Sequence, residues 1–328
     1  MWPLALFSRR RLAVVGATVP LTVLLASYGG LFLPRTGAGQ AEGGARLRVM
    51  TANVLYLSDD GSALEPLIRA ESPDLICLQE LNPRLAQDLT ARLGRDYPYY
   101  TLRPEEDTSG LGLFSRYRLR DVGEIPDPAW PHGAQTATIT LAGQPVLVLN
   151  VHAVPIVLPS HTGHSVTDME ERYRLREEEA RLWRDWVAQH EGSVIVAGDL
   201  NATDQNRSYR LLAAGLQDAH RQAGRGLGHT WPAHRGWLGA IPLPGRLWRV
   251  DYVLASEEGQ VASSRVGRRD GRSDHLPVVA DLVLGSGSSS SAVPGLFEAP
   301  LLWTLSVQAY MPNIPLFHPV GRRTPQRA

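Results

Sequence analysis

The chain has 328 residues, which is enough for one large domain or two small ones. Its formal net charge is zero, so the composition gives no sign of a polyanionic partner such as nucleic acid. The single cysteine, Cys77, excludes an intrachain disulfide and lies in an apolar run that is typical of a buried strand.

The N-terminal segment has the pattern of a membrane anchor. Residues 1–11 end in Arg9, Arg10 and Arg11, and an uncharged run follows over residues 12–34. As a helix this run would reach about 34 Å, enough to cross a hydrocarbon core, and basic residues ahead of it favour a cytoplasmic N-terminus. We therefore predict a single-pass protein of the cell membrane, with the rest of the chain outside the cytoplasm. A cleaved signal peptide is the alternative, but its apolar region would be shorter and its cleavage site clearer.

The rest of the chain divides into three parts by composition. Residues 35–45 are small and Gly-rich and predict a flexible spacer, while residues 46–284 have the mixed composition of a globular domain. Residues 285–328 begin as a Ser/Gly linker and continue as an apolar, Pro-rich C-terminal tail, in which the prolines disfavour a spanning helix.

Within the globular part, apolar runs of strand length alternate with segments of helical spacing. Helices are predicted over 61–70, 83–93 and 169–190, the last with an apolar stripe of Leu175, Leu182, Trp183, Trp186 and Val187. Strands are predicted over 47–54, 74–80, 111–115, 136–141, 145–152, 193–199, 250–256 and 276–284. This mixture indicates an α/β fold in which layers are built on sheets.

Polar side chains recur at the ends of these predicted strands. Each of them alone would more often be a solvated loop residue, but ligands at the ends of sheet strands converge on one mouth. Side chains two residues apart in a strand share a face, which pairs Asn150 with His152 and Asp199 with Asn201. The full set comprises Asn53, Glu80, Asn150, His152, Asp199, Asn201, Asp251, Asp274 and His275.

The residue types in this set indicate metal-assisted chemistry. A hard divalent cation prefers oxygen ligands, so Asn53, Glu80 and Asp274 predict a Mg²⁺ or Mn²⁺ site. A zinc site is disfavoured because the chain has one cysteine and its candidate histidines are far apart in sequence. A serine hydrolase would need a G-x-S-x-G elbow and a P-loop would need a lysine, and the sequence contains neither.

The motifs TAN, LQE, SGLGLFSRYRL, NVH, GDLNAT, RVDYVLAS and SDHLPV occur in this order along the chain. Over about residues 46–284 the order resembles that of the endonuclease/exonuclease/phosphatase superfamily. The resemblance implies an α/β fold, a four-layer α/β sandwich of two packed mixed β-sheets flanked by helices, which here would follow the N-terminal transmembrane helix. It also implies in-line hydrolysis of a phosphoester without a covalent enzyme intermediate.

The resemblance assigns roles to the residues that match its motifs. Asn53 and Glu80 would hold the divalent metal, and Asp274 would join them or shape a second metal position. Asp199 would orient or deprotonate the attacking water, and Asn201 would hold a phosphate oxygen.

The two motif histidines complete the implied site. His152 and His275 would hydrogen-bond the phosphoryl group or act as acid or base, and Asp251 would pair with His275 and fix its tautomer. Asn150 would share the substrate contact of His152. An acid from the segment before Gly110 would orient His152, and three candidates stay open: Glu105, Glu106 and Asp107.

The predicted anchor and the loops indicate a substrate class. A catalytic domain held at a membrane meets lipid headgroups at high effective concentration, and the Trp- or Pro-rich stretches 153–165 and 230–248 suit a lipid surface. A lipid or polyprenyl phosphate is therefore favoured over nucleic acid, and the arrangement is similar to membrane-bound bacterial cell-envelope members of the superfamily. The alternative is a secreted or anchored nuclease, with the basic stretch 265–272 as its phosphate contact. A catalytically inactive binding domain is disfavoured because no motif residue is missing.

Overall fold

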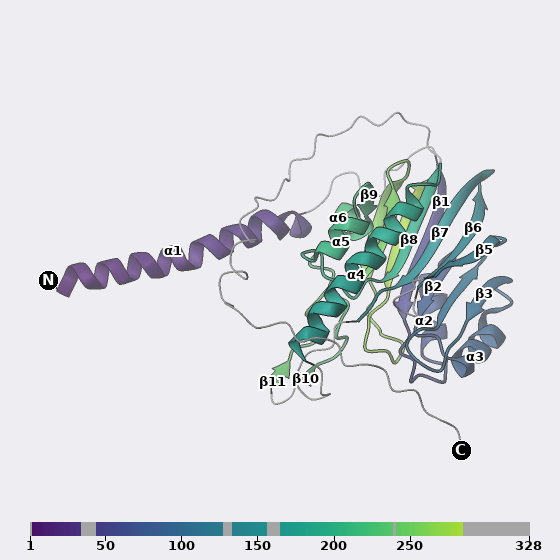
Figure 1. Cartoon of the computed structure of the whole chain (residues 1–328), viewed down its shortest axis with the longest axis horizontal. Coiled ribbons are helices and arrows are strands. Elements are labelled where there is room, and N and C mark those ends of the chain that lie inside the picture. Colours follow the sequence, from purple (N-terminus) through teal and green to yellow (C-terminus); the bar gives the residue numbers. More distant parts are fainter. Residues whose placement is uncertain (1, 34–43, 127–132, 156–164, 239–240, 285–328) are drawn as a thin grey trace, which may run out of the picture. The chain divides into compact units, whose positions relative to one another are not determined.

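The computed structural model describes residues 2–33, 44–126, 133–155, 165–238 and 241–284 (Figure 1). The predicted C-terminal tail, most of the predicted spacer and most of the stretch 153–165 lie outside the described residues. Two six-stranded sheets and one two-stranded sheet form within the described ranges.

The strands of the first sheet are β1 (Ala45–Asn53), β2 (Leu75–Gln79), β3 (Tyr99–Arg103), β4 (Leu111–Ser115), β13 (Gln260–Val266) and β14 (Val278–Leu284). Those of the second sheet are β5 (Arg120–Ile125), β6 (Ala134–Leu141), β7 (Gln144–His152), β8 (Ser193–Asp199), β9 (Leu216–Asp218) and β12 (Asp251–Ser256). The strand orders are β13-β14-β1-β2-β4-β3 and β5-β6-β7-β8-β12-β9. The two-stranded sheet pairs β10 (Gly236–Leu238) with β11 (Ile241–Leu243).

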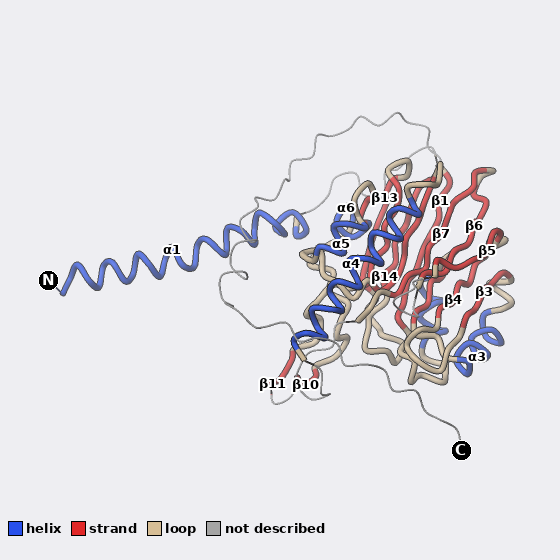
Figure 2. Tube along the Cα trace, viewed as in Figure 1, coloured by secondary structure: helices blue, strands red, loops and turns tan. Residues whose placement is uncertain are grey.

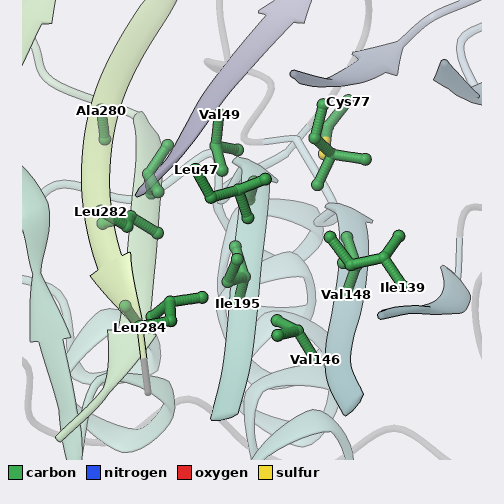
Figure 3. Close-up of a cluster of buried hydrophobic side chains, with 14 of the residues drawn as sticks. Leu47, Val49, Cys77, Ile139, Val146, Val148, Ile195, Ala280, Leu282 and Leu284 are labelled. Carbon is green, nitrogen blue, oxygen red and sulfur yellow. The ribbon is translucent and has the colours of Figure 1, made fainter. Parts of the chain in front are cut away.

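Helices cover the outer face of each large sheet (Figure 2). They are α2 (Leu64–Glu71) and α3 (Pro83–Leu93) on the first sheet, and α4 (Val166–Val187) and α5 (Arg207–Leu212) on the second. The short helix α6 (Ala219–Ala223) instead contributes Ala219 to an apolar cluster between the two sheets. Apolar clusters join α2 and α3 to the first sheet and α4 and α5 to the second, and a third cluster, which includes Leu47 and Ile195, lies between the sheets (Figure 3). The α/β sandwich that the sequence predicts is therefore confirmed. Because both of its faces are covered, a central strand such as β2 is buried throughout, and it is apolar up to Gln79 at its end.

The topology brings the predicted site residues to one edge of the sandwich. β1 and β2 run parallel in the first sheet, and β7 and β8 run parallel in the second, so Asn53 ends beside Gln79 and His152 beside Asp199. β14 and β12 run antiparallel to β1 and β8, so their first residues reach the same edge, and Asp251 lies opposite Asp199. A hydrogen bond between Asn53 and Asp199 shows that the edges of the two sheets coincide.

The helix α4 is the amphipathic helix predicted over 169–190, and Leu182, Trp183, Trp186 and Val187 of its predicted stripe pack on the second sheet. It starts at a capping box, in which Ser165 Oγ accepts from the N–H of Asp168 at 3.2 Å and Asp168 accepts from the N–H of Ser165 at 2.7 Å. Leu175 of the predicted stripe is only half-buried, and the buried side chains are Arg176, Glu179, Ala180 and Trp183. Two ionisable side chains, Arg176 and Glu179, are thus buried although they lie outside the predicted stripe.

The N-terminal helix, α1 (Trp2–Tyr28), begins and ends earlier than the span predicted over residues 12–34, and a 3-10 turn, η1 (Gly29–Phe32), follows it. Nowhere in the described ranges does a helix combine the length and the apolar character that a membrane crossing needs. The structure therefore does not support the predicted transmembrane helix. The end of the helix is held by hydrogen bonds, from Tyr28 Oη to Asp204 Oδ1 at 2.9 Å and from the N–H of Gly226 to the carbonyl oxygen of Leu31 at 2.8 Å.

Gly198 precedes Asp199 in β8 and leaves no room for a side chain. Its φ is +155°, and a Cβ at this position would lie 1.9 Å from the carbonyl oxygen of Val151 in β7. We expect Gly198→Ala to lower the free energy of unfolding by at least about 2 kcal/mol, because it combines an unfavourable backbone region with a backbone clash. Urea denaturation of the two proteins measures this change.

Gly143 in the β6–β7 turn provides the matched control, since its φ is +82° and nothing lies within 4 Å of a Cβ built there. Gly143→Ala should lose about 1 kcal/mol, from the left-handed backbone alone. Equal losses in the two variants would show that the close approach of β7 and β8 does not constrain Gly198.

Candidate active site

Asp199 is the centre of the site. It ends β8, and its side chain is buried, with 1% exposure. Its Oδ2 accepts a hydrogen bond from Asn53 Nδ2 at 3.1 Å and lies 3.8 Å from His152 Nε2 and 3.7 Å from His275 Nε2. Its Oδ1 accepts from the backbone N–H of Asn201 at 2.8 Å. A single carboxylate therefore joins predicted site residues from both sheets.

Glu80 lies beside Asn53 in the same cluster. The backbone at Glu80 is left-handed, with a φ of +59°, a conformation that non-glycine residues adopt mostly at functional sites and turns. Its Oε1 accepts from Asn53 Nδ2 at 3.0 Å, and its Oε2 accepts from the backbone N–H of Tyr56 at 3.1 Å. Because Asn53 Nδ2 also reaches Asp199, one amide bridges two carboxylates. The Glu80 side chain is the more accessible of the two, with 14% exposure.

Asp251 and His275 form an ion pair inside the site. His275 Nδ1 lies 3.0 Å from Asp251 Oδ2, and both side chains are buried. Burial favours the neutral imidazole, but the negative charges of Asp251 and Asp199 outweigh it and raise the pKa of His275 to about 10. His275 is therefore protonated at neutral pH, and its Nε2 presents a proton toward Asp199.

The pKa of Asp199 is shifted upward from its ordinary value. Burial is the largest cause and the charge of Asp251 adds to it, while His275 and His152 act in the opposite direction. A carboxylate with raised proton affinity is a better general base, and a neighbouring imidazolium is a general acid. The site thus holds a base and an acid within 3.7 Å of each other.

His152 takes its orientation from the backbone. Its Nδ1 lies 2.9 Å from the carbonyl oxygen of Thr108, so Nδ1 carries the proton and Nε2 faces Glu80 and Asp199. The sequence predicts an acid from residues 105–107 at this nitrogen. The structure places the backbone carbonyl of the next residue, Thr108, at this nitrogen, and the acid stays a prediction.

Asn150 lies too deep for the substrate contact that the sequence predicts. It is fully buried between the sheets, where its Oδ1 accepts from Gln79 Nε2 at 2.6 Å. Its Nδ2 donates to the carbonyl oxygens of Leu78 at 2.9 Å and Gly112 at 3.1 Å. An amide engaged in this way by the opposite sheet has no donor or acceptor directed to a substrate. Asn150 is therefore a structural link that fixes β7 against β2 and β4.

Asn201 and Asp274 are half-buried members of the site. Asn201 has a left-handed backbone, with a φ of +46°, and its Nδ2 donates to the carbonyl oxygen of Ala153 at 2.9 Å. Asp274 Oδ2 accepts from Trp231 Nε1 at 3.0 Å, and the Trp231 ring lies 6.3 Å from the ring of His275. Sequence reasoning included Trp231 only as part of a lipid-facing loop and missed its contact with Asp274.

The donor set fits a divalent cation. Oxygen atoms of Glu80 and Asp199 share the Asn53 amide. Oxygen atoms of Asp199 and Asp251 lie within 4.8 Å of each other, and the protonated His275 beside them has no lone pair to offer a metal. These carboxylates outnumber the imidazolium, and Oδ1 of Asp251 is buried with no hydrogen bond to any described residue. A hard cation with oxygen ligands would offset this excess of negative charge. The residues present therefore suit a Mg²⁺ or Mn²⁺ ion.

Comparison with known proteins agrees with this fold. A profile of the Endonuclease/Exonuclease/phosphatase family matches residues 50–275, and the chain belongs to that family. Members of this family are hydrolases that act on phosphoesters. A search among curated proteins gave no match.

Solved structures share the fold at low sequence identity. The endonuclease/exonuclease/phosphatase from Bacteroides vulgatus is 22% identical, with a TM-score of 0.56 over 73% of this chain and 99% of its own. The protein of the same description from Beutenbergia cavernae is 24% identical, with a TM-score of 0.54 over 74% of this chain and 72% of its own. Humanized D. rerio TDP2 is 20% identical, with a TM-score of 0.58 over 72% of this chain and 98% of its own.

The raised pKa of His275 predicts a titration that can be observed in the metal-free protein. We expect the imidazole to stay protonated at neutral pH and to titrate at about pH 10. Because the folded pKa lies above the unfolded value of about 6.5, the stabilisation is complete below about pH 6.5 and is lost as the pH rises through about 10. NMR of the imidazole protons over this range measures the midpoint.

Asp251→Asn is the matched variant, because it removes the charge and keeps the shape of the side chain. In this variant the pKa of His275 should fall toward its ordinary value, since Asp251 is the strongest of the groups that raise it. If His275 of the wild type titrates with a midpoint of about pH 6.5, this result would contradict the ion pair.

Proposed function

We propose that this protein is a divalent-metal-dependent phosphoester hydrolase that uses water as the nucleophile in an in-line displacement. The observation that carries the proposal is the position of Asp199, which is buried and lies next to Asn53, His152 and His275 at once. A carboxylate base, an imidazolium and a metal-fitting pair of oxygen donors in one cluster are the groups that this reaction needs.

The acid–base residues have separate tasks in the proposed reaction. Asp199 accepts a proton from the attacking water, for which its raised pKa suits it. His275, held protonated by Asp251, donates to a phosphoryl or leaving-group oxygen. His152 presents Nε2 to the phosphoryl group, while the carbonyl oxygen of Thr108 holds its Nδ1.

The proposed metal ligands are Asn53, Glu80 and Asp274, and the proposed ion is Mg²⁺ or Mn²⁺. When bound, the ion offsets the negative charge that develops on the phosphoryl group. Asn201 holds a phosphate oxygen in this proposal, and its left-handed backbone and its hydrogen bonds to Asp199 and Ala153 support a fixed position.

Substitution of Glu80 and His275 tests the proposed chemistry. Glu80→Gln and His275→Ala should each lower kcat on a chromogenic phosphodiester by about 100-fold or more, because one removes a metal ligand and the other the acid. Mg²⁺ should raise the Tm of the wild type and of His275→Ala, but much less that of Glu80→Gln, because only ligands that bind the folded state stabilise it. Glu258→Gln, at an exposed position between β12 and β13, is the control. Full activity in either site variant would contradict the assignment.

We further infer that the substrate is a lipid or polyprenyl phosphate at the cell envelope. Large apolar side chains in and after α1 are exposed, among them Leu21, Leu25, Phe32 and Leu33. Exposed apolar stretches of this kind are typical of segments that contact a membrane or a partner. With Arg9 to Arg11 ahead of it, the segment favours attachment to the membrane. The extracytoplasmic location of the catalytic domain stays a proposal that rests on the sequence alone.

A nuclease is the alternative function. Arg268 and Arg269 are exposed on the loop that precedes Asp274 and His275, and a basic loop there suits a nucleic-acid backbone. The structure of D. rerio TDP2 complexed with single strand DNA product is similar in fold, with a TM-score of 0.57 and 21% identity. The lipid substrate stays preferred because the formal net charge of the chain is zero.

A substrate panel separates these two functions. The full chain, in phospholipid vesicles with Mg²⁺, is offered a polyprenyl phosphate, a polyprenyl diphosphate, a phospholipid, plasmid DNA and a single-stranded oligonucleotide. We expect release of phosphate or headgroup from a lipid at least about tenfold faster than cleavage of either DNA, and loss of all activity with a chelator. Efficient cleavage of DNA with no release from any lipid would replace the lipid proposal by the nuclease.

A further inference from the structure

Helix α4 contacts both of the loops that complete the site. The loop after β7 follows His152, and the loop after β8 contains Asn201. We propose that Arg176 and Glu179 of α4 are positioning residues that hold these two loops for catalysis. The proposal rests on the proposed hydrolase function and assigns a task to residues that do not touch the reacting atoms.

Arg176 holds the loop after β8. Its side chain is buried, with 1% exposure, and its Nη1 donates to the carbonyl oxygen of Asn201. A left-handed backbone, with the φ of +46° at Asn201, persists in a non-glycine residue only where its surroundings hold it. The other hydrogen bonds that hold Asn201 run from its N–H to Asp199 Oδ1 at 2.8 Å and from its Nδ2 to the carbonyl oxygen of Ala153 at 2.9 Å.

Glu179 holds the loop after β7 from the same face of the helix. Its Oε2 accepts from the backbone N–H of Val154 at 2.9 Å, and Arg172 donates to the carbonyl oxygen of Pro155 at 3.1 Å. Arg172, Arg176 and Glu179 follow one another at helical spacing, so they share one side of α4. This side therefore contacts the backbone of both loops at once.

Apolar side chains would stabilise this contact better than charged ones. Farther along the helix, α4 buries Ala180 and Trp183 in the apolar cluster on the second sheet. At Arg176, burial lowers the pKa of the guanidinium, and neither Nε nor Nη2 has a hydrogen-bond partner among the described residues. A buried ion of this kind is weak as a source of stability, but it fixes the direction of the carbonyl group that it binds.

A displaced loop would disturb the base and the histidine. The N–H of Asn201 binds Asp199, so a shift of this loop releases one oxygen of the base, and Val154 follows His152 by two residues. A misplacement of about 1 Å lowers catalytic rates by about 100-fold. Metal binding should change little, because Glu80 comes from the first sheet and not from these loops.

The test compares Arg176→Met with Arg174→Met in the full chain. Arg174 lies on the exposed side of the same helix, where it pairs with Glu171 and Glu178. Arg176→Met should lower kcat by about 10- to 100-fold, while the Mg²⁺-induced rise in Tm changes by less than about twofold. Hydrogen exchange should become faster in peptides that cover residues 199–204. Arg174→Met should match the wild type in all of these measurements.

Glu179 offers an independent pair of variants. Glu179→Leu removes the acceptor of the Val154 N–H, so we expect a lower kcat and faster exchange in peptides that cover residues 152–155. Glu179→Gln keeps an acceptor and should restore kcat to within about threefold of the wild type. If Arg176→Met does not fold, these two variants carry the test.

Unchanged kcat and unchanged exchange in Arg176→Met and Glu179→Leu would overturn the proposal. Faster exchange throughout the domain, with no preference for the two loops, would overturn it as well, because it marks a role in stability alone. If the wild-type protein hydrolyses no phosphoester offered to it, the proposed function fails. The exchange measurements then still decide whether α4 holds the loops.

Discussion

The site depends on the hydrogen bond between Asn53 and Asp199, which joins the ends of the two sheets at 3.1 Å. Deeper between the sheets, the 2.6 Å hydrogen bond between Gln79 of β2 and Asn150 of β7 also joins the two sheets. The apolar cluster between the sheets fills the remaining space. Each sheet carries only part of the proposed catalytic set. The proposed acid, base and metal ligands therefore meet only when the two sheets pack in one register, so correct packing of the core is a condition for the proposed chemistry.

The sequence predicts the central strands because they are apolar on both faces. β2 and β8 lie between a helical layer and the opposite sheet, so their apolar runs are long and uninterrupted. The strands β3, β5, β9 and β13 are not predicted, because a strand at the edge of a sheet exposes many of its side chains. In β5 only Ile125 is buried. The apolar pattern of a sequence therefore reveals strands that are buried, and it misses strands that are exposed at a sheet edge.

The site residues are predictable by type but not by depth. Asn150 and His152 share a face of β7, yet a strand rises about 3.3 Å per residue, which places Asn150 about 7 Å farther inside. Arg176 and Glu179 escape prediction because a charged residue in a helix is ordinarily exposed. Thr108 contributes a carbonyl oxygen to the site, and no pattern of side chains records a backbone group. The sequence therefore predicts the chemical groups of the site, but not how deep each side chain lies or which backbone groups it contacts.

Under the proposed function, the chemistry and the choice of substrate depend on different parts of the fold. Asp199 and His275 stand at strand ends that the sheet core fixes, whereas Trp231 reaches the site from the long connection between α6 and β12. Loops accept changes more readily than strands, because fewer buried contacts depend on them. The same carboxylates and imidazoles can thus serve different phosphoesters, since their geometry does not depend on what lies beyond the phosphate. It follows that substitutions in 230–248 should alter substrate preference while Asp199 keeps its partners, whereas substitutions between the sheets should abolish activity on every substrate together.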